Sequence, residues 1–104
     1  MSLALVAGCS PRATEVTITN ASSGTLSNLV VSCTGDSYRI EALAAGASVR
    51  RGLRASSESD VRIAFDAVGR TISTSIGVYL EPASGGSIDI TIDPKLGVTA
   101  RQQP

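Results

Sequence analysis

The sequence contains no histidine. Histidine is the commonest general base in enzymes and the commonest protein ligand for metals, so its absence excludes the usual catalytic triads and most zinc or copper sites. Asp89 and Asp93 share one face of a predicted strand, so catalysis by two carboxylates and calcium binding remain possible. A catalytic Ser–Lys pair would have to use Lys95, the sole lysine. Acids are common on the polar face of soluble strands. We therefore expect a chain that is not an enzyme and that binds no metal and no cofactor.

Tryptophan is also absent, and the charges balance at nine basic against nine acidic residues. Sugar-binding sandwiches stack sugar rings on Trp or Tyr, and here only Tyr38 and Tyr79 remain. A chain without net charge has no overall field that attracts nucleic acid or an anionic membrane surface. No apolar run reaches the roughly 18 to 20 residues that a membrane-spanning helix requires. Nucleic acid is therefore not an expected partner.

What the sequence does contain is a repeated alternation of apolar and polar residues. In "EVTITN", Val16 and Ile18 alternate with threonines, which is the period of two of a half-buried strand. The same pattern recurs between turns rich in Gly, Ser, Asp and Asn, and a glycine at position 52 indicates a bulge. Strands are predicted over residues 15–20, 27–33, 37–43, 47–54, 61–66, 71–80 and 88–93, with a further short edge strand at "GVTA", 97–100.

Strands at this spacing predict an all-β fold. We expect an antiparallel β-sandwich of about seven strands with immunoglobulin-like architecture. The 104 residues suffice for one core. The pattern resembles small immunoglobulin-like or transthyretin-like sandwiches in architecture alone, because the tryptophan and the inter-sheet disulfide of antibody domains are missing.

The start of the chain, "LALVAGCS", has a different character. Val6, Ala7, Gly8 and Cys9 match the lipobox and resemble the precursors of bacterial lipoproteins. The resemblance implies cleavage between Gly8 and Cys9, a lipid on the Cys9 sulfur, and a tethered protein rather than a spanning one. Ser10 resembles the residue that permits sorting to the outer membrane, so the protein is expected there, facing the periplasm. The alternative is an ordinary first strand over 3–8 with a stray thiol at Cys9.

This resemblance sets the expected domain boundaries. Residues 1–8 are expected to be the remnant of a lipoprotein signal peptide, and 9–14 a tether. The sandwich is expected over 15–100, and 101–104 should form a mobile tail.

Cys33 is the second of two cysteines. If Cys9 carries a lipid, Cys33 has no partner for a disulfide. Its phase with Leu29 and Val31 predicts a small buried side chain, and no histidine is present to activate it as a nucleophile.

Three arginines, Arg50, Arg51 and Arg54, cluster around one predicted strand, with Arg39 nearby in sequence. They could bind phosphate or carboxylate groups of a partner. Alternatively, they protect an exposed sheet edge from pairing with a neighbouring strand.

Two functions from different classes are consistent with these features. The first is a non-catalytic cell-envelope lipoprotein domain that acts as a structural or protein-interaction module, docking on another envelope protein through loops or an edge strand. The second is a periplasmic module that binds a small ligand or an ion, with its site in the loops around "TGDS", 34–37, and "EPASGG", 81–86. A paired edge or a large apolar patch would favour the first, and a concave site with convergent polar groups the second.

Overall fold

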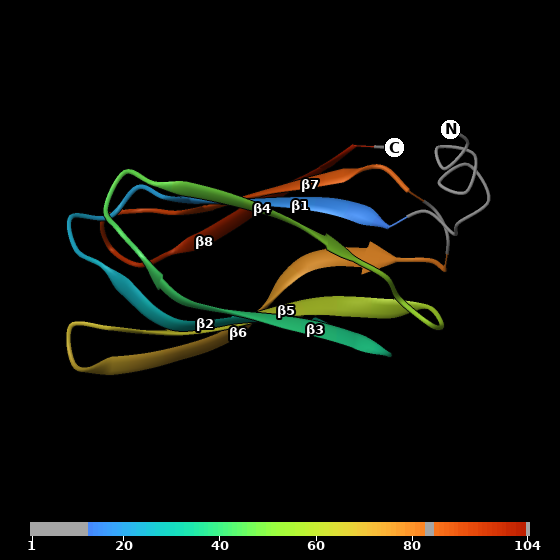
Figure 1. The fold of residues 1–104 in the computed structure, drawn as a ribbon, viewed down its shortest axis with the longest axis horizontal. Helices are drawn as coiled ribbons and strands as arrows, with labels where there is room; N and C mark the ends of the chain where they lie inside the picture. Colours follow the sequence, from blue (N-terminus) through green and yellow to red (C-terminus); the bar gives the residue numbers. More distant parts are fainter. Residues whose placement is uncertain (1–12, 83–84, 104) are drawn as a thin grey trace, which may run out of the picture.

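The computed structural model describes residues 13–82 and 85–103, and these residues form eight β-strands (Figure 1). The strands are β1 Thr14–Asn20, β2 Leu26–Cys33, β3 Asp36–Leu43, β4 Ser48–Leu53, β5 Ser59–Ala67, β6 Arg70–Leu80, β7 Ser87–Ile92 and β8 Val98–Gln103. The seven main predicted strands correspond to β1 to β7. The short edge strand predicted at 97–100 corresponds to β8. In the structure β8 continues through Gln103, and Arg101 pairs with Asp89 of β7, although the sequence predicts a mobile tail over 101–104.

The strands form two four-stranded sheets packed face to face, which confirms the β-sandwich. One sheet has the order β4-β1-β7-β8 and the other β3-β2-β5-β6. Neighbouring strands are antiparallel except β1 and β7, which are parallel. In immunoglobulin constant-type domains the first, second, fifth and fourth strands share a sheet. The likeness to immunoglobulins therefore concerns the sandwich architecture and not the strand order.

The core lies between the sheets and is aliphatic. Because side chains alternate along a strand, every second residue of β1, β5 and β7 faces inward, and these residues are buried. The inward side chains of largest volume that are fully buried are Val16, Ile18, Leu26, Leu29, Val31, Leu53, Ile63, Phe65, Leu80, Ile88, Ile90 and Ile92. Each contributes about 1.5–3 kcal/mol through removal of its apolar surface from water.

The bulge expected at Gly52 is absent. Residues Thr14 to Thr19 of β1 pair without interruption with Leu53 to Ser48 of β4. Glycine fits at position 52 because of its close approach to Ala13, since an added Cβ would lie 3.1 Å from the Ala13 Cβ. The register shifts instead between Ser27 and Val30 of β2, and between Asp60 and Arg62 of β5, opposite the part of β6 that holds Gly77 with φ 76°.

The two ends of the sandwich differ in what they carry. The turns that follow β1, β3, β5 and β7 gather at one end, on the left of Figure 1, and this end is called the loop end below. Strand β1 begins at the other end, near the turns that follow β2 and β4. The longest dimension of the molecule is 46 Å. The described residues hold no helix of the length and apolarity needed to cross a membrane.

Candidate functional site

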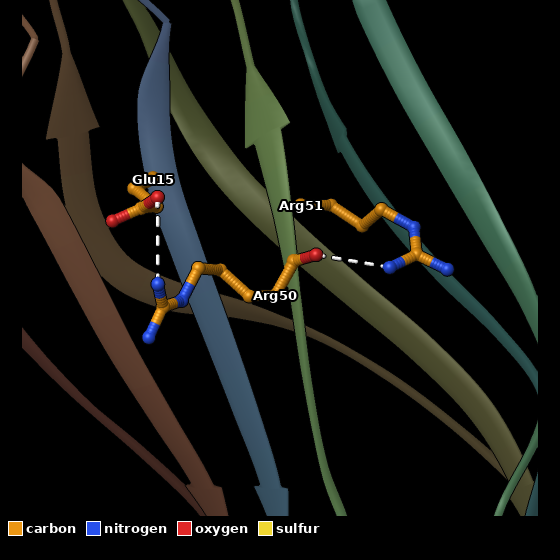
Figure 2. Close-up of polar contacts among 3 residues, drawn as sticks. All are labelled: Glu15, Arg50 and Arg51. Atoms are coloured by element: carbon orange, nitrogen blue, oxygen red, sulfur yellow. Dashed lines mark hydrogen bonds and ion pairs between the residues drawn. The ribbon is translucent and has the colours of Figure 1, made fainter.

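Two of the three clustered arginines, Arg50 and Arg51, are consecutive residues of β4. The side chains of Arg50 and Arg51 leave the strand in opposite directions, as Figure 2 shows. Arg50 reaches over β1, where its Nη1 lies 3.9 Å from Oε2 of Glu15. Arg51 Nη1 donates a hydrogen bond of 2.9 Å to the carbonyl oxygen of Arg50. A single ligand group therefore does not meet both guanidinium groups.

Arg54 follows the end of β4, where its backbone N–H donates to Oδ2 of Asp36 at 2.9 Å. Arg39 lies on β3 of the other sheet and donates to Oδ1 of Asn28. Arg50 and Arg51 thus point to opposite sides of β4, and Arg39 belongs to the other sheet. β4 is the edge strand of its sheet, and charges along it match the edge-protecting interpretation.

Tyr38 lies on β3, an edge strand of its sheet, and packs against the core. Its hydroxyl oxygen is buried and has no hydrogen-bond partner in the described structure. Burial raises the pKa of the Tyr38 phenol to about 12, and the charge of Arg51 opposes this effect in part. The phenol therefore stays protonated throughout the neutral range.

Cys33 is half-buried at the end of β2 and packs against the core, so it is less enclosed than the sequence predicts. Burial raises the pKa of its thiol, and the nearby charge of Asp36 adds to the increase. A thiol with a raised pKa is protonated at neutral pH and is a weak nucleophile.

A polar network crosses the outer face of the sheet that contains β2 and β5. Asn28 Nδ2 donates to Oδ2 of Asp66 at 2.9 Å, and Thr71 Oγ1 donates to Oδ1 of the same carboxylate at 2.7 Å. These hydrogen bonds, first from Asn28 and then from Thr71, lower the pKa of Asp66. Asn28 sits in the β2 bulge with φ 49°, a conformation that asparagine tolerates better than most residues.

Asn20 holds the turn after β1 against the opposite sheet. The residue is fully buried, and its Nδ2 donates to the carbonyl oxygens of Gly24 at 2.8 Å and Leu43 at 2.9 Å. Its Oδ1 accepts from the Ser22 N–H at 2.9 Å and from Ser22 Oγ at 2.6 Å. The side-chain amide of Asn20 therefore uses both of its donor hydrogens and both of its acceptor positions.

A concave site with a volume of about 500 Å³ lies at the loop end. Three turns that are distant in sequence form it: the turn after β1, the β5–β6 hairpin turn and the turn after β7. We call it the loop-end cavity. Its lining consists of Ser22, Ser23, Gly24, Thr25, Ala67, Val68, Arg70, Pro94, Lys95 and Leu96.

The lining of the loop-end cavity contains two cations, Arg70 and Lys95, and no acid. Among the described residues the one ion pair within 4.0 Å is Arg50–Glu15, so neither cation has a carboxylate partner there. Asp93, which precedes the cavity residues of the β7–β8 turn, directs its Oδ1 to the N–H groups of Lys95 and Gly97, each at 2.8 Å. The charged side chains that line the cavity are therefore both positive.

Backbone strain is concentrated at the same cavity. Three non-glycine residues of the described chain have positive φ, and two of them, Val68 at 51° and Leu96 at 67°, line it. A β-branched residue is an outlier in this conformation, and such strain clusters at ligand-binding sites. Val68 is also 86% exposed, the highest value for a large apolar residue in the described chain.

The loop-end cavity is not where the sequence predicts a ligand site. The "TGDS" turn lies at the opposite end, where Cys33, Thr34, Asp60 and their neighbours line a smaller hollow of about 240 Å³. Part of "EPASGG", 83–84, lies outside the described residues, as do the lipobox and Cys9. Within the described chain, no group of three His, Cys, Asp or Glu residues could hold a metal ion. Sequence reasoning missed the cavity because no motif marks it.

Neither a protein-family model nor a curated protein matches this sequence. Among solved structures, the chain is similar to the NMR structure of a protein from Eubacterium rectale, with a TM-score of 0.60. The two share 14% sequence identity over 88% of each chain. At that identity the similarity concerns the fold alone, and the protein is similar in its β-sandwich to this bacterial protein.

Proposed function

We propose that the protein is a non-catalytic binding domain of the bacterial cell envelope, tethered through a lipid on Cys9 and binding a small ligand in the loop-end cavity. Of the two functions that the sequence leaves open, a concave site with convergent polar groups favours the ligand-binding one. The observation that carries this proposal is the cavity of about 500 Å³. It is lined by two cations that have no carboxylate partner among the described residues, and by two of the three non-glycine residues with positive φ in the described chain.

The position of β1 supports a site directed away from the membrane. Cys9 precedes Thr14, the first residue of β1, by five positions. Five residues span at most about 18 Å when fully extended, which is well below the 46 Å long axis of the molecule. A lipid on Cys9 would therefore hold the end where β1 begins near the bilayer, with the loop end in the periplasm.

The side-chain chemistry supports binding rather than bond-making. The pKa of Cys33 and the pKa of Tyr38 are both raised, so neither group supplies an anionic nucleophile or base at neutral pH. Arg70 and Lys95 instead offer fixed positive charge, which suits recognition of a ligand.

Two experiments test the proposal. Mass spectrometry of the protein isolated from its native bacterium should find a diacylglyceryl group on Cys9, and Cys9→Ser should release the protein from the membrane fraction. Crystals soaked with fragments of mixed charge should show binding at the turns 21–25, 68–69 and 93–97. An unmodified Cys9 thiol would contradict the tether, and fragments bound mainly elsewhere would contradict the site.

A second candidate function is protein docking through β6, an edge strand of its sheet. No charged residue occurs from Thr71 to Leu80, whereas β3, β4 and β8 all carry charges. β8 covers the end of β6, since Gln102 Nε2 donates to the carbonyl oxygen of Tyr79 at 3.1 Å. The stretch from Thr71 to Ser75 is thus the part of this edge best able to accept a strand from another envelope protein.

In-cell photo-crosslinking from position 73 tests this second candidate, with exposed Asp89 on the other sheet as the control position. Docking would be supported if one envelope protein is crosslinked and if this product is lost when Thr71→Lys, two residues from position 73, places a charge on the edge. Equal crosslinking from both positions would contradict it.

A further inference from the structure

We infer that the loop-end cavity takes a small organic anion, in which a phosphate or carboxylate group is joined to a short apolar group. This inference rests on the proposed function and deepens it, because it names the class of ligand. Three properties of the cavity carry it: the sign of its charge, the apolar part of its wall, and its size.

The charge comes from the β5–β6 hairpin and from the turn after β7. Arg70 and Lys95 line the cavity from these two elements, and no carboxylate joins them in the lining. The acids nearest in sequence lie outside the lining and already accept hydrogen bonds, Asp93 from the N–H groups of Lys95 and Gly97 and Asp66 from Asn28 and Thr71. A guanidinium group binds carboxylate or phosphate oxygens in pairs, and an ammonium group adds a second point charge.

The remaining wall supplies neutral donors and apolar contacts. The hydroxyl-bearing residues Ser23 and Thr25 stand on the β1–β2 side of the cavity. Val68 lies on the hairpin, two residues before Arg70, and Leu96 lies on the β7–β8 turn, directly after Lys95. A ligand that binds Arg70 and Lys95 through its anionic group thus brings an attached apolar group near Val68 and Leu96.

The size of the cavity agrees with such a ligand. Pockets for small molecules have volumes of about 300–1,000 Å³, and this cavity, at about 500 Å³, lies within that range. Because the cavity is partly open, we expect the ligand to be bound through its anionic head, with the apolar group lying along the wall. Each methylene that contacts this wall should strengthen binding by up to about fourfold.

Titration calorimetry with compounds of equal length and different charge tests the inference. Butyl phosphate and pentanoate should bind the full chain, and butan-1-ol and butylammonium should bind at least about tenfold more weakly. Inorganic phosphate should bind more weakly than butyl phosphate because it makes no apolar contact. Binding of the anions should weaken as the salt concentration rises.

Variants assign the binding to the cavity. Arg70→Gln and Lys95→Gln should each weaken butyl phosphate binding about tenfold. Arg62→Gln is the matched control, because it removes the same charge from β5 near the opposite end and should leave the affinity unchanged. Circular dichroism should show the same fold for all three variants, since each arginine or lysine is exposed.

Two results would overturn the inference in distinguishable ways. If butylammonium or butan-1-ol binds at the loop-end cavity as tightly as butyl phosphate, the ligand class is wrong while the proposed binding function stands. If fragments of every charge fail to bind at these turns, the proposed function fails together with the inference.

Discussion

Replacement of Asn20 by alanine should destabilise the domain and open the loop-end cavity. Asn20 is fully buried and bonds to backbone groups of the β1–β2 turn and of β3 in the opposite sheet. Alanine at position 20 would remove the hydrogen bonds that Asn20 makes to two buried groups, the Leu43 carbonyl and the Ser22 N–H. Ser22 Oγ would still donate to the carbonyl oxygen of Gly24 at 3.1 Å. Each unsatisfied buried group costs about 1–3 kcal/mol, so for two groups we expect a loss of about 2–6 kcal/mol.

This loss is large compared with the whole stability of a small domain, which is about 5–15 kcal/mol. The melting temperature should fall by about 8–50 °C, because 1 kcal/mol corresponds to about 4–8 °C at this size. Since the chain has no tryptophan, urea unfolding is best followed by far-ultraviolet circular dichroism. Asn28→Gly is the control, because it removes surface hydrogen bonds, tolerates positive φ and should cost less than about 1 kcal/mol. A loss below about 1 kcal/mol for Asn20→Ala would refute the reasoning.

Three further predictions concern strain and pH. Val68→Asn should raise the free energy of unfolding, measured by urea unfolding, by about 1 kcal/mol. Asparagine followed by glycine suits a hairpin turn in which both central residues have positive φ, as Val68 and Gly69 do. A loss of stability would contradict the turn geometry. The pKa of Tyr38 is raised from its ordinary value near 10 to about 12, so between these pH values the folded state keeps a proton that the unfolded state has lost. The free energy of unfolding should therefore fall from about pH 10 to pH 12. The fall should be less than about 2.7 kcal/mol, because the Tyr38 ring is partly exposed to solvent. Tyr38→Phe should remove this fall, and an unchanged pH profile would contradict the burial of the hydroxyl. The pKa of Asp66 is lowered, so its contribution is present above the unfolded pKa and is lost as pH falls through the folded value; Asp66→Asn should reduce the acid dependence measured by urea unfolding, and identical acid profiles would contradict the network.

The sandwich could be predicted because burial on one face of a strand leaves a local signature. The alternation of Val61, Ile63 and Phe65 with polar residues recurs as burial of every second residue in β5. The sequence predicted β8 as a short strand, because only "GVTA" carries a strand pattern there. Pairing with β7 extends it over residues that are polar and exposed.

The candidate site could not be predicted in the same way. Its walls come from the 22–25, 67–70 and 94–96 regions, which the sandwich topology brings together although they are far apart in sequence. Arg70 and Lys95 look like ordinary turn residues when each is seen alone. Similarly, the role of Asn20 depends on Leu43 of the opposite sheet, and no local pattern records that contact. The strand assignment also placed a bulge at Gly52, because glycine in a strand has several causes and close approach of Ala13 is one of them.

Nuclear magnetic resonance of the labelled full chain, titrated with butyl phosphate, tests most directly whether the loop-end cavity is the binding site. Glycines report on both ends of the sandwich: Gly24 and Gly69 belong to turns at the loop end, and Gly35 to the β2–β3 turn at the other. We predict that the amide signals of Gly24 and Gly69 shift together and saturate, that Gly35 stays unchanged, and that Arg70→Gln suppresses the shifts. Saturable shifts centred on Gly35, with Gly24 and Gly69 unaffected, would contradict the central claim.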